Sequence, residues 1–102
     1  MPSIKKILKD YQITTKEALI NSVKGTEKEN YMLTHFKASN LDEAVDKLFS
    51  IVESIHYREI ELKDEKDSRV VWDNSQRNIY NMEIGDLNDT KKRLELLLAK
   101  LK

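Results

Sequence analysis

The chain has 102 residues, of which 39% are hydrophobic and 35% charged, and 18 basic side chains balance 18 acidic ones. This length predicts a single domain, residues 1–102, with one small core. No apolar run approaches the roughly 18 residues that a membrane helix needs, and the charged N-terminus lacks the apolar segment of a signal peptide. Cysteine is absent, which excludes disulfides and thiolate metal sites and fits a cytoplasmic protein.

Helix-start signals are frequent in the first part of the chain. Ser3 is placed to cap a first helix, and Thr14 with Glu17 matches the capping box of a second. Gly25 then predicts the end of that second helix, because glycine adopts the left-handed conformation without steric cost.

The segment 29–37 admits two interpretations. Thr26 with Glu29 is a further capping-box match and predicts a helix through about Lys37. Residues 31–36 are equally typical of a strand in composition. We favour the helix, which would place two helices around the glycine turn.

Residues 41–55 predict the core helix. Asn40 with Glu43 forms a variant of the capping box, and apolar residues then recur at helical spacing. These residues are Leu41, Val45, Leu48, Val52 and Ile55. The outer face of this helix is acidic and would repel a phosphate backbone, so we do not expect it to contact DNA.

Residues 57–84 predict a polar, three-stranded antiparallel ribbon. Alternation with a period of two and β-forming residues indicate the three strands. The strands are residues 57–62, 70–72 and 79–84. The connections 63–68 and 73–78 contain no glycine, so loops longer than a tight two-residue turn are expected.

A last helix is predicted from Thr90, after a turn at residues 85–89. Its leucine stripe consists of Leu94, Leu97, Leu98 and Leu101, widened by Leu96. Such a stripe either packs on its own domain or forms a dimer interface, and the sequence leaves both alternatives open. The expected fold class is therefore α+β: N-terminal helices, the three-stranded antiparallel ribbon and a C-terminal helix.

Signatures of catalysis and metal binding are absent from the sequence. His35 and His56 have no partner at a metal-ligand spacing, and Gly25 and Gly85 cannot form a phosphate-binding loop. We therefore expect a protein that is not an enzyme and that needs no cofactor.

The loop 73–78 carries amide and hydroxyl groups and one arginine directly after Trp72. Such groups bond to base edges and phosphates, although a solvated hairpin tip has the same composition. With the neighbouring loop, it supplies the candidate nucleic-acid-binding residues. These are Lys63, Lys66, Arg69, Asn74, Gln76 and Arg77.

The order of TTKEALINSVKG, TEKENYMLTHFK and the ribbon REIELKDEKDSRVVWDNSQRNIYNMEI resembles a small winged helix-turn-helix domain. The lysine-rich, glycine-poor composition and the leucine-striped last helix resemble the relaxosome accessory proteins of clostridial conjugative plasmids. That resemblance implies a homodimer that binds specific double-stranded DNA, as a plasmid-transfer accessory factor or regulator beside a relaxase. The acidic helix 41–55 departs from the usual pattern, which shifts the expected DNA contacts to the wing.

A second hypothesis is a small protein-binding module, such as a phage- or plasmid-encoded inhibitor or adaptor. The zero net charge and the mixed-sign ribbon favour it. Trp72 and Tyr80 would then be interface anchors, because aromatic side chains dominate binding hot spots.

Overall fold

The computed structural model describes residues 2–68 and 73–101, and within these ranges the chain forms five α-helices and no strand. They are α1 (Ile4–Asp10), α2 (Lys16–Val23), α3 (Glu27–Phe36), α4 (Leu41–Ser68) and α5 (Asn74–Leu101). The expected α+β winged helix-turn-helix fold with its three-stranded ribbon is therefore wrong. Two of its strands, 57–62 and 79–84, lie inside α4 and α5, and the third, 70–72, lies outside the described residues.

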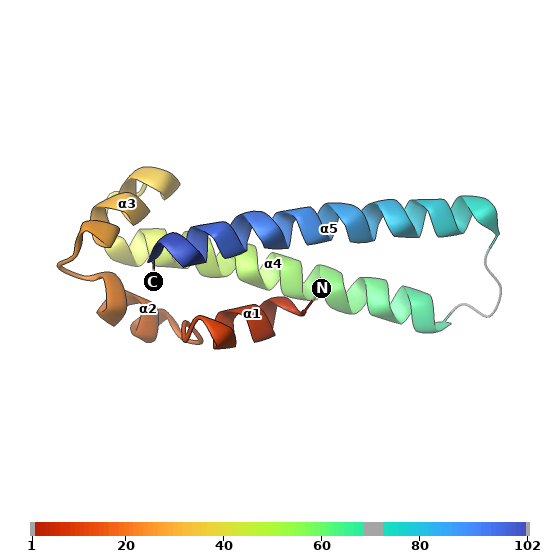
Figure 1. Ribbon diagram of the computed structural model, residues 1–102, viewed down its shortest axis with the longest axis horizontal. Coiled ribbons are helices and arrows are strands. Elements are labelled where there is room, and N and C mark those ends of the chain that lie inside the picture. The colour runs from red at the N-terminus through yellow and green to blue at the C-terminus, as the bar shows by residue number, and fades with distance from the viewer. Residues whose placement is uncertain (1, 69–72, 102) are drawn as a thin grey trace.

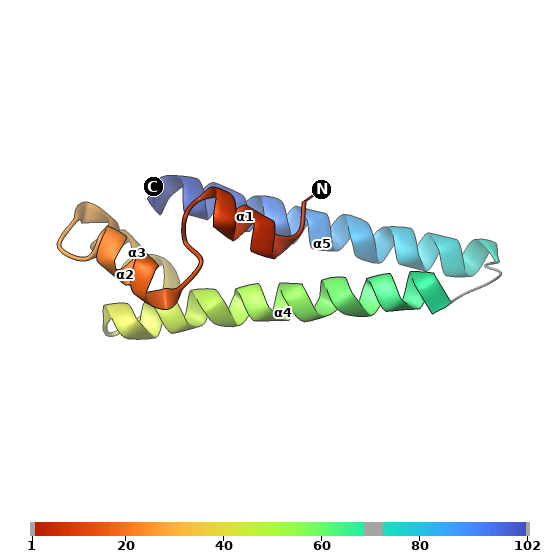
Figure 2. The ribbon, with the colours of Figure 1, turned by 90° about the horizontal axis from the view of Figure 1, so that it is seen from below.

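A long antiparallel hairpin of α4 and α5 determines the shape of the molecule, which measures 54 × 21 × 19 Å (Figure 1). α1 lies along one side of this hairpin, and α2 and α3 lie at the end where α4 begins (Figure 2). α4 contacts each of the other four helices. We call residues 41–58 and 92–101 the proximal half of the hairpin, and residues 60–68 and 74–90 the distal half.

The short helices begin at the capping residues that the sequence indicates, with one shift. The side chain of Ser3 caps α1, as predicted. Thr26 caps α3, so the favoured helical interpretation of the segment after it is confirmed. Thr15, one residue later than the predicted Thr14, caps α2 by accepting a hydrogen bond from the Ala18 N–H at 3.1 Å.

α4 begins at the cap predicted from Asn40 and Glu43. The Glu43 N–H donates to Asn40 Oδ1 at 2.8 Å, and Glu43 Oε2 accepts from the Ser39 N–H at 3.1 Å. The hydrogen bond from Ser39, helped by Lys47, lowers the pKa of the Glu43 carboxyl below its ordinary value. These contacts satisfy backbone donors that a helix start otherwise leaves without partners.

α5 begins at a capping box that the sequence interpretation overlooked. Asp73 Oδ1 accepts a hydrogen bond from the Gln76 N–H at 2.7 Å, and Gln76 Oε1 accepts one from the Asp73 N–H at 3.3 Å. This reciprocal pair is the pattern of a helix start. The predicted loop 73–78 is consequently the first turn of α5, and the predicted turn 85–89 lies within the same helix.

The two long helices pack along a seam with heptad spacing. On α4 the inward positions are Val45, Leu48, Val52, Ile55, Glu59 and Leu62, and on α5 they are Tyr80, Ile84, Leu87, Lys91, Leu94, Leu98 and Leu101. Steps of three and four residues are typical of helices packed side by side at a small angle. The period-two interpretation grouped Met82 with Tyr80 and Ile84, yet Met82 is 69% exposed.

The leucine stripe of the last helix packs on its own domain. Its four predicted members, Leu94, Leu97, Leu98 and Leu101, belong to the buried core. Leu96, which was expected to widen the stripe, is 67% exposed instead. The leucine stripe thus packs within the molecule and is not available as a dimer interface. The homodimer stays a prediction.

The two glycines allow a direct check of this helical assignment. Gly85 lies inside α5, with open space where the methyl group of an alanine would stand, whereas Gly25 has a φ of +77°. Gly85→Ala should raise the free energy of unfolding by about 0.5–1 kcal/mol, because alanine favours a helix. Gly25→Ala should lower it by about 1 kcal/mol, because alanine is strained at a positive φ. Urea unfolding followed by circular dichroism measures both, and a destabilised Gly85→Ala variant would indicate a turn at residue 85.

Candidate functional site: the distal groove

An open groove runs between α4 and α5 in the distal half of the hairpin. Its volume is about 370 Å³, and it lies on the side of the hairpin along which α1 runs in the proximal half (Figure 2). Its lining residues are Ser3, Glu59, Leu62, Lys63, Lys66, Tyr80, Ile84, Leu87, Asn88 and Lys91. Ser3 precedes α1 directly, so the groove begins where α1 begins and extends toward the far end of the hairpin.

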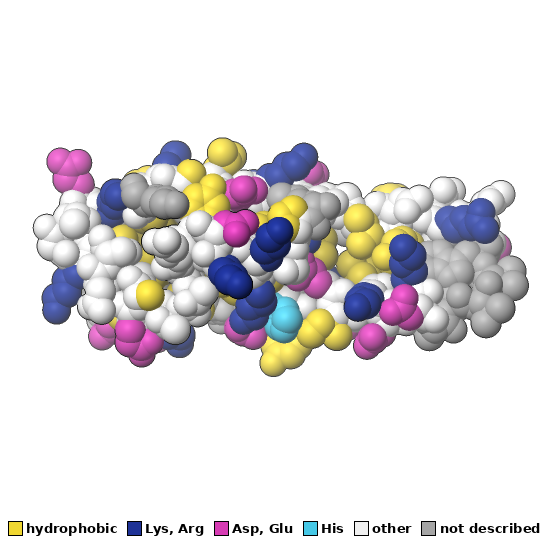
Figure 3. Space-filling model, turned by 60° about the horizontal axis from the view of Figure 1, so that its bottom comes forward, with side chains coloured by type: hydrophobic (Ala, Val, Ile, Leu, Met, Phe, Trp, Pro, Cys, Tyr) yellow, Lys and Arg dark blue, Asp and Glu magenta, His cyan; other side chains and the backbone are white. Residues whose placement is uncertain are grey.

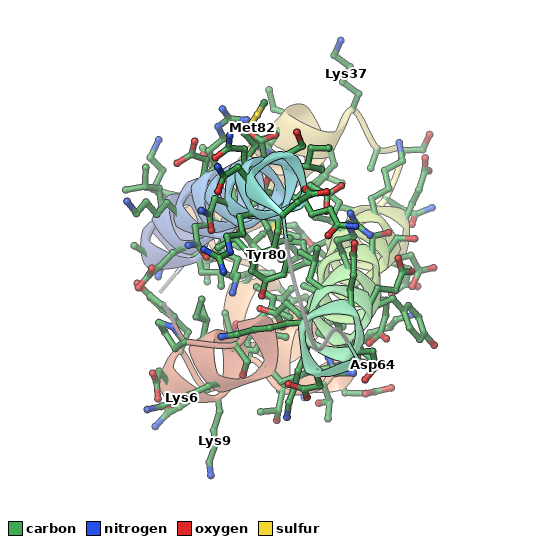
Figure 4. All side chains as sticks on the ribbon, turned by 90° about the vertical axis from the view of Figure 1, so that its right-hand side faces the viewer. Lys6, Lys9, Lys37, Asp64, Tyr80 and Met82 are labelled. Atoms are coloured by element: carbon green, nitrogen blue, oxygen red, sulfur yellow. The ribbon has the colours of Figure 1, made fainter. Side chains whose placement is uncertain are left out.

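The floor of the groove is apolar. Leu62 is buried, and Ile84 and Leu87 are half-buried between the two helices. Tyr80 lies on the inner side of α5, whereas Met82 points away from the hairpin (Figure 4). Hydrophobic side chains are visible in this hollow between the long helices, with lysine and arginine side chains at its border (Figure 3).

The border of the groove is cationic. Lys63 and Lys66 line the groove from α4 and are exposed, and Arg77 is exposed on α5 one helical turn before Tyr80, beyond the lining residues. Among the described residues, no salt bridge involves these three cations. The carboxylate among the lining residues is that of Glu59, one turn before Lys63, and it is paired with Lys91. Apart from the Glu59–Lys91 pair, the charged residues that line the groove are therefore two lysines.

A buried ion pair closes the inner end of the groove. Lys91 Nζ lies 2.5 Å from Glu59 Oε1, and the two side chains are only 6% and 16% exposed. Glu59 also accepts a hydrogen bond from the Ile4 N–H at 3.2 Å, and Lys91 donates one to the Pro2 carbonyl at 3.1 Å. The pair therefore fixes the start of α1 between the long helices and separates the covered proximal half from the open groove.

On the other side of the seam, an ion-pair network joins the long helices. Arg58 of α4 contacts Glu83 of α5 at 2.8 Å and Glu61 of its own helix at 2.9 Å. All three side chains are partly exposed, so their contribution to stability is modest. On this side of the hairpin, charge pairs connect the two long helices. On the groove side, the surface between the helices is apolar.

The structure places the predicted site residues at one end of the molecule, on two helices rather than on a wing. Lys63 and Lys66 line the groove, and Asn74 and Arg77 lie on the first turn of α5. Gln76 caps α5 with its amide oxygen. Arg69 lies outside the described residues, as does Trp72, the expected interface anchor.

The apolar floor was missed as a site. Tyr80, Ile84 and Leu87 were assigned to a strand face and a turn, although they are spaced four and three residues apart. That spacing, continued by Lys91 and Leu94, is the signal that would have placed them on one face of a long helix.

Two further site classes find no support in the part of the chain that the structure describes. Residues 2–68 and 73–101 contain no cluster of three or more histidine or carboxylate side chains that could hold a metal ion. None of the helices in these ranges combines the length and the apolar character that crossing a membrane requires.

Over the described residues, fold and site together define a helical protein built on an antiparallel hairpin, with the apolar-floored groove on the side of α1. Comparison of the chain with protein-family models, curated proteins and solved structures finds no match. The resemblance to relaxosome accessory proteins therefore stays a prediction, and a functional proposal has to start from the groove.

Proposed function

We propose that this protein is a protein-binding module, an adaptor or an inhibitor, that holds a helical segment of its partner in the distal groove. The observation that supports this is the unequal covering of the hairpin. In the proximal half α1 covers the space between α4 and α5, whereas no described helix covers the distal groove (Figure 2).

α1 itself is the precedent for such a partner. Its residues Ile4, Ile7 and Leu8 are at most 2% exposed, because they pack on the hairpin. A partner helix in the same line would cover Ile84, Leu87 and the rest of the apolar floor. Burial of that surface supplies the binding energy, at about 25 cal/mol per Å² of apolar area, and laying an amphipathic helix into a groove is a common recognition mode.

Sequence-specific binding of duplex DNA stays a prediction from the sequence. It was expected from a wing, and the described part of that segment is helical. Phosphate contacts need cations but no apolar floor, and a net charge of zero gives weak general attraction to DNA. The observed groove therefore favours the protein-binding alternative. The relaxase likewise stays a predicted partner.

The proposal is tested with a displayed library of amphipathic helical peptides whose non-apolar positions are randomised. We expect selected peptides to bind the protein and to lose about tenfold in affinity with Ile84→Ser, which removes an apolar side chain from the groove floor. Met82→Ser is the matched control, because Met82 lies two residues away on the same helix and points away from the groove (Figure 4).

Fluorescence anisotropy of the selected peptides measures these affinities, and circular dichroism confirms that both variants are folded. A library that yields no binder would contradict the proposal. Binders that lose affinity equally in both variants would also contradict it, because they would not depend on the groove.

A further inference from the structure

We infer that the partner of the distal groove is an acidic amphipathic helix, with carboxylates along the edges of its apolar face. This inference rests on the proposed function, which requires only that the groove accepts a helix. What it adds is the chemistry of the partner, and the proximal half of the same hairpin supplies the comparison.

In the proximal half a basic helix lies beside a carboxylate of α4. Lys5 of α1 forms a salt bridge with Glu53 of α4 at 2.6 Å, and this contact lowers the pKa of the Glu53 carboxyl. On the α5 side, Glu95 and Lys92 together line a hollow beside Tyr11, at the end of α1, so this side carries both charges. The α4 side of the hairpin thus presents a carboxylate to a helix that carries three lysines and one aspartate.

In the distal half the side chains on the α4 border of the groove are positively charged instead. Lys63 and Lys66 line the groove on α4, and neither of them forms a salt bridge with a described residue. Asn88 is neutral, and the Glu59–Lys91 pair at the inner end cancels its own charge. A second helix with the charge of α1 would be repelled here, whereas an acidic helix would repeat the proximal arrangement with the charges exchanged.

The length of the groove sets the length of the partner. From Tyr80 to Lys91 the groove follows α5 for about 16 Å, which is about three turns of helix. The partner helix would lie in line with α1, beyond Ser3, with its apolar face on Leu62, Ile84 and Leu87.

A second copy of this chain fits the groove less well. An isologous dimer through the groove would bring two borders of the same cationic character together, which is unfavourable. The basic α1 of another copy would meet the same repulsion. These two arrangements are therefore alternatives that the experiment has to separate.

The test uses three labelled, stapled peptides of about 12 residues with the same apolar face. Their edge positions carry glutamate, glutamine or lysine. We expect the acidic peptide to bind about tenfold more tightly than the neutral one at about 0.05 M salt, and this advantage to shrink at about 0.5 M salt. The Lys63→Glu/Lys66→Glu variant should prefer the lysine peptide instead.

The matched control is Lys6→Glu/Lys9→Glu, which makes the same charge change on α1. Lys6 and Lys9 point outward from α1 and away from the groove (Figure 4). This variant should retain the order of the three peptides. Fluorescence anisotropy measures binding, and sedimentation measures the oligomeric state of every variant.

The outcomes separate the inference from the proposed function. Equal binding of the acidic and neutral peptides, or an unchanged order in Lys63→Glu/Lys66→Glu, overturns the acidic partner but leaves helix binding intact. If none of the three peptides binds, both proposals fall. A dimer that Lys63→Glu/Lys66→Glu dissociates, or a labelled random duplex that displaces the acidic peptide, assigns the groove to another occupant and overturns the inference.

Discussion

Lys91→Met is expected to lower the free energy of unfolding by about 3 kcal/mol. Lys91 is 6% exposed in its side chain, and its ammonium group lies 2.5 Å from Glu59. Removing one partner of a buried pair leaves the other charge without compensation, which typically costs about 3–5 kcal/mol. The lower end of that range applies, because Glu59 retains some contact with water and the hydrogen bond from the Ile4 N–H. Urea unfolding measures the change.

The double variant Glu59→Leu/Lys91→Leu distinguishes a lost ion pair from lost packing. Both positions belong to the heptad seam, and their neighbours there, Ile55, Leu62 and Leu94, are apolar and buried. Replacing both partners with apolar side chains removes the unpaired charge, so the double variant should recover most of the stability of the original protein. A double variant as unstable as Lys91→Met would show that the charges are not the cause.

Leu98→Ala is expected to lower the free energy of unfolding by about 3 kcal/mol. Leu98 is fully buried in the core that α4 and α5 share with α1. Truncating such a leucine loses its transfer free energy and leaves a cavity, and measured costs of this change are about 3–5 kcal/mol.

The control for this prediction is Leu96→Ala on the same helix. Leu96 is 67% exposed, so its truncation should change stability by less than about 0.5 kcal/mol. Chemical denaturation of the two variants compares them directly. Similar losses in both would contradict the helix register that separates the buried leucines from Leu96.

The start of the chain was predictable because its helices are specified by local chemistry. Ser3, Thr26 and Asn40 each accept a hydrogen bond from a backbone N–H within three residues, so no distant partner has to be known. The same reasoning applied to Asp73 and Gln76 would have shown that α5 begins there. Local cap signals were thus sufficient for α1, α3 and α4, whereas the local turn signal at residues 85–89 was wrong, because that segment lies inside α5.

The long helices were misassigned because their apolar series is interrupted by charge. Glu59 and Lys91 occupy inward positions, so each helix seen alone loses its heptad spacing at that point. These two charged residues are compatible with a core only because they pair with each other across the hairpin. That contact depends on the tertiary structure and is not visible in either helix alone. The candidate cations Lys63 and Lys66 line one groove, but their apolar neighbours on α5 could not be placed beside them without the hairpin.

The Glu59–Lys91 pair also fixes the alignment of the two long helices. A regular heptad seam of leucine, isoleucine and valine can slide by seven residues and still bury apolar side chains against one another. Here such a slip in either direction would separate Lys91 from Glu59 and set Glu59 against an aliphatic residue of α5, at a cost of several kcal/mol for the two buried charges. One polar layer therefore makes a single alignment of the hairpin much more stable than its alternatives.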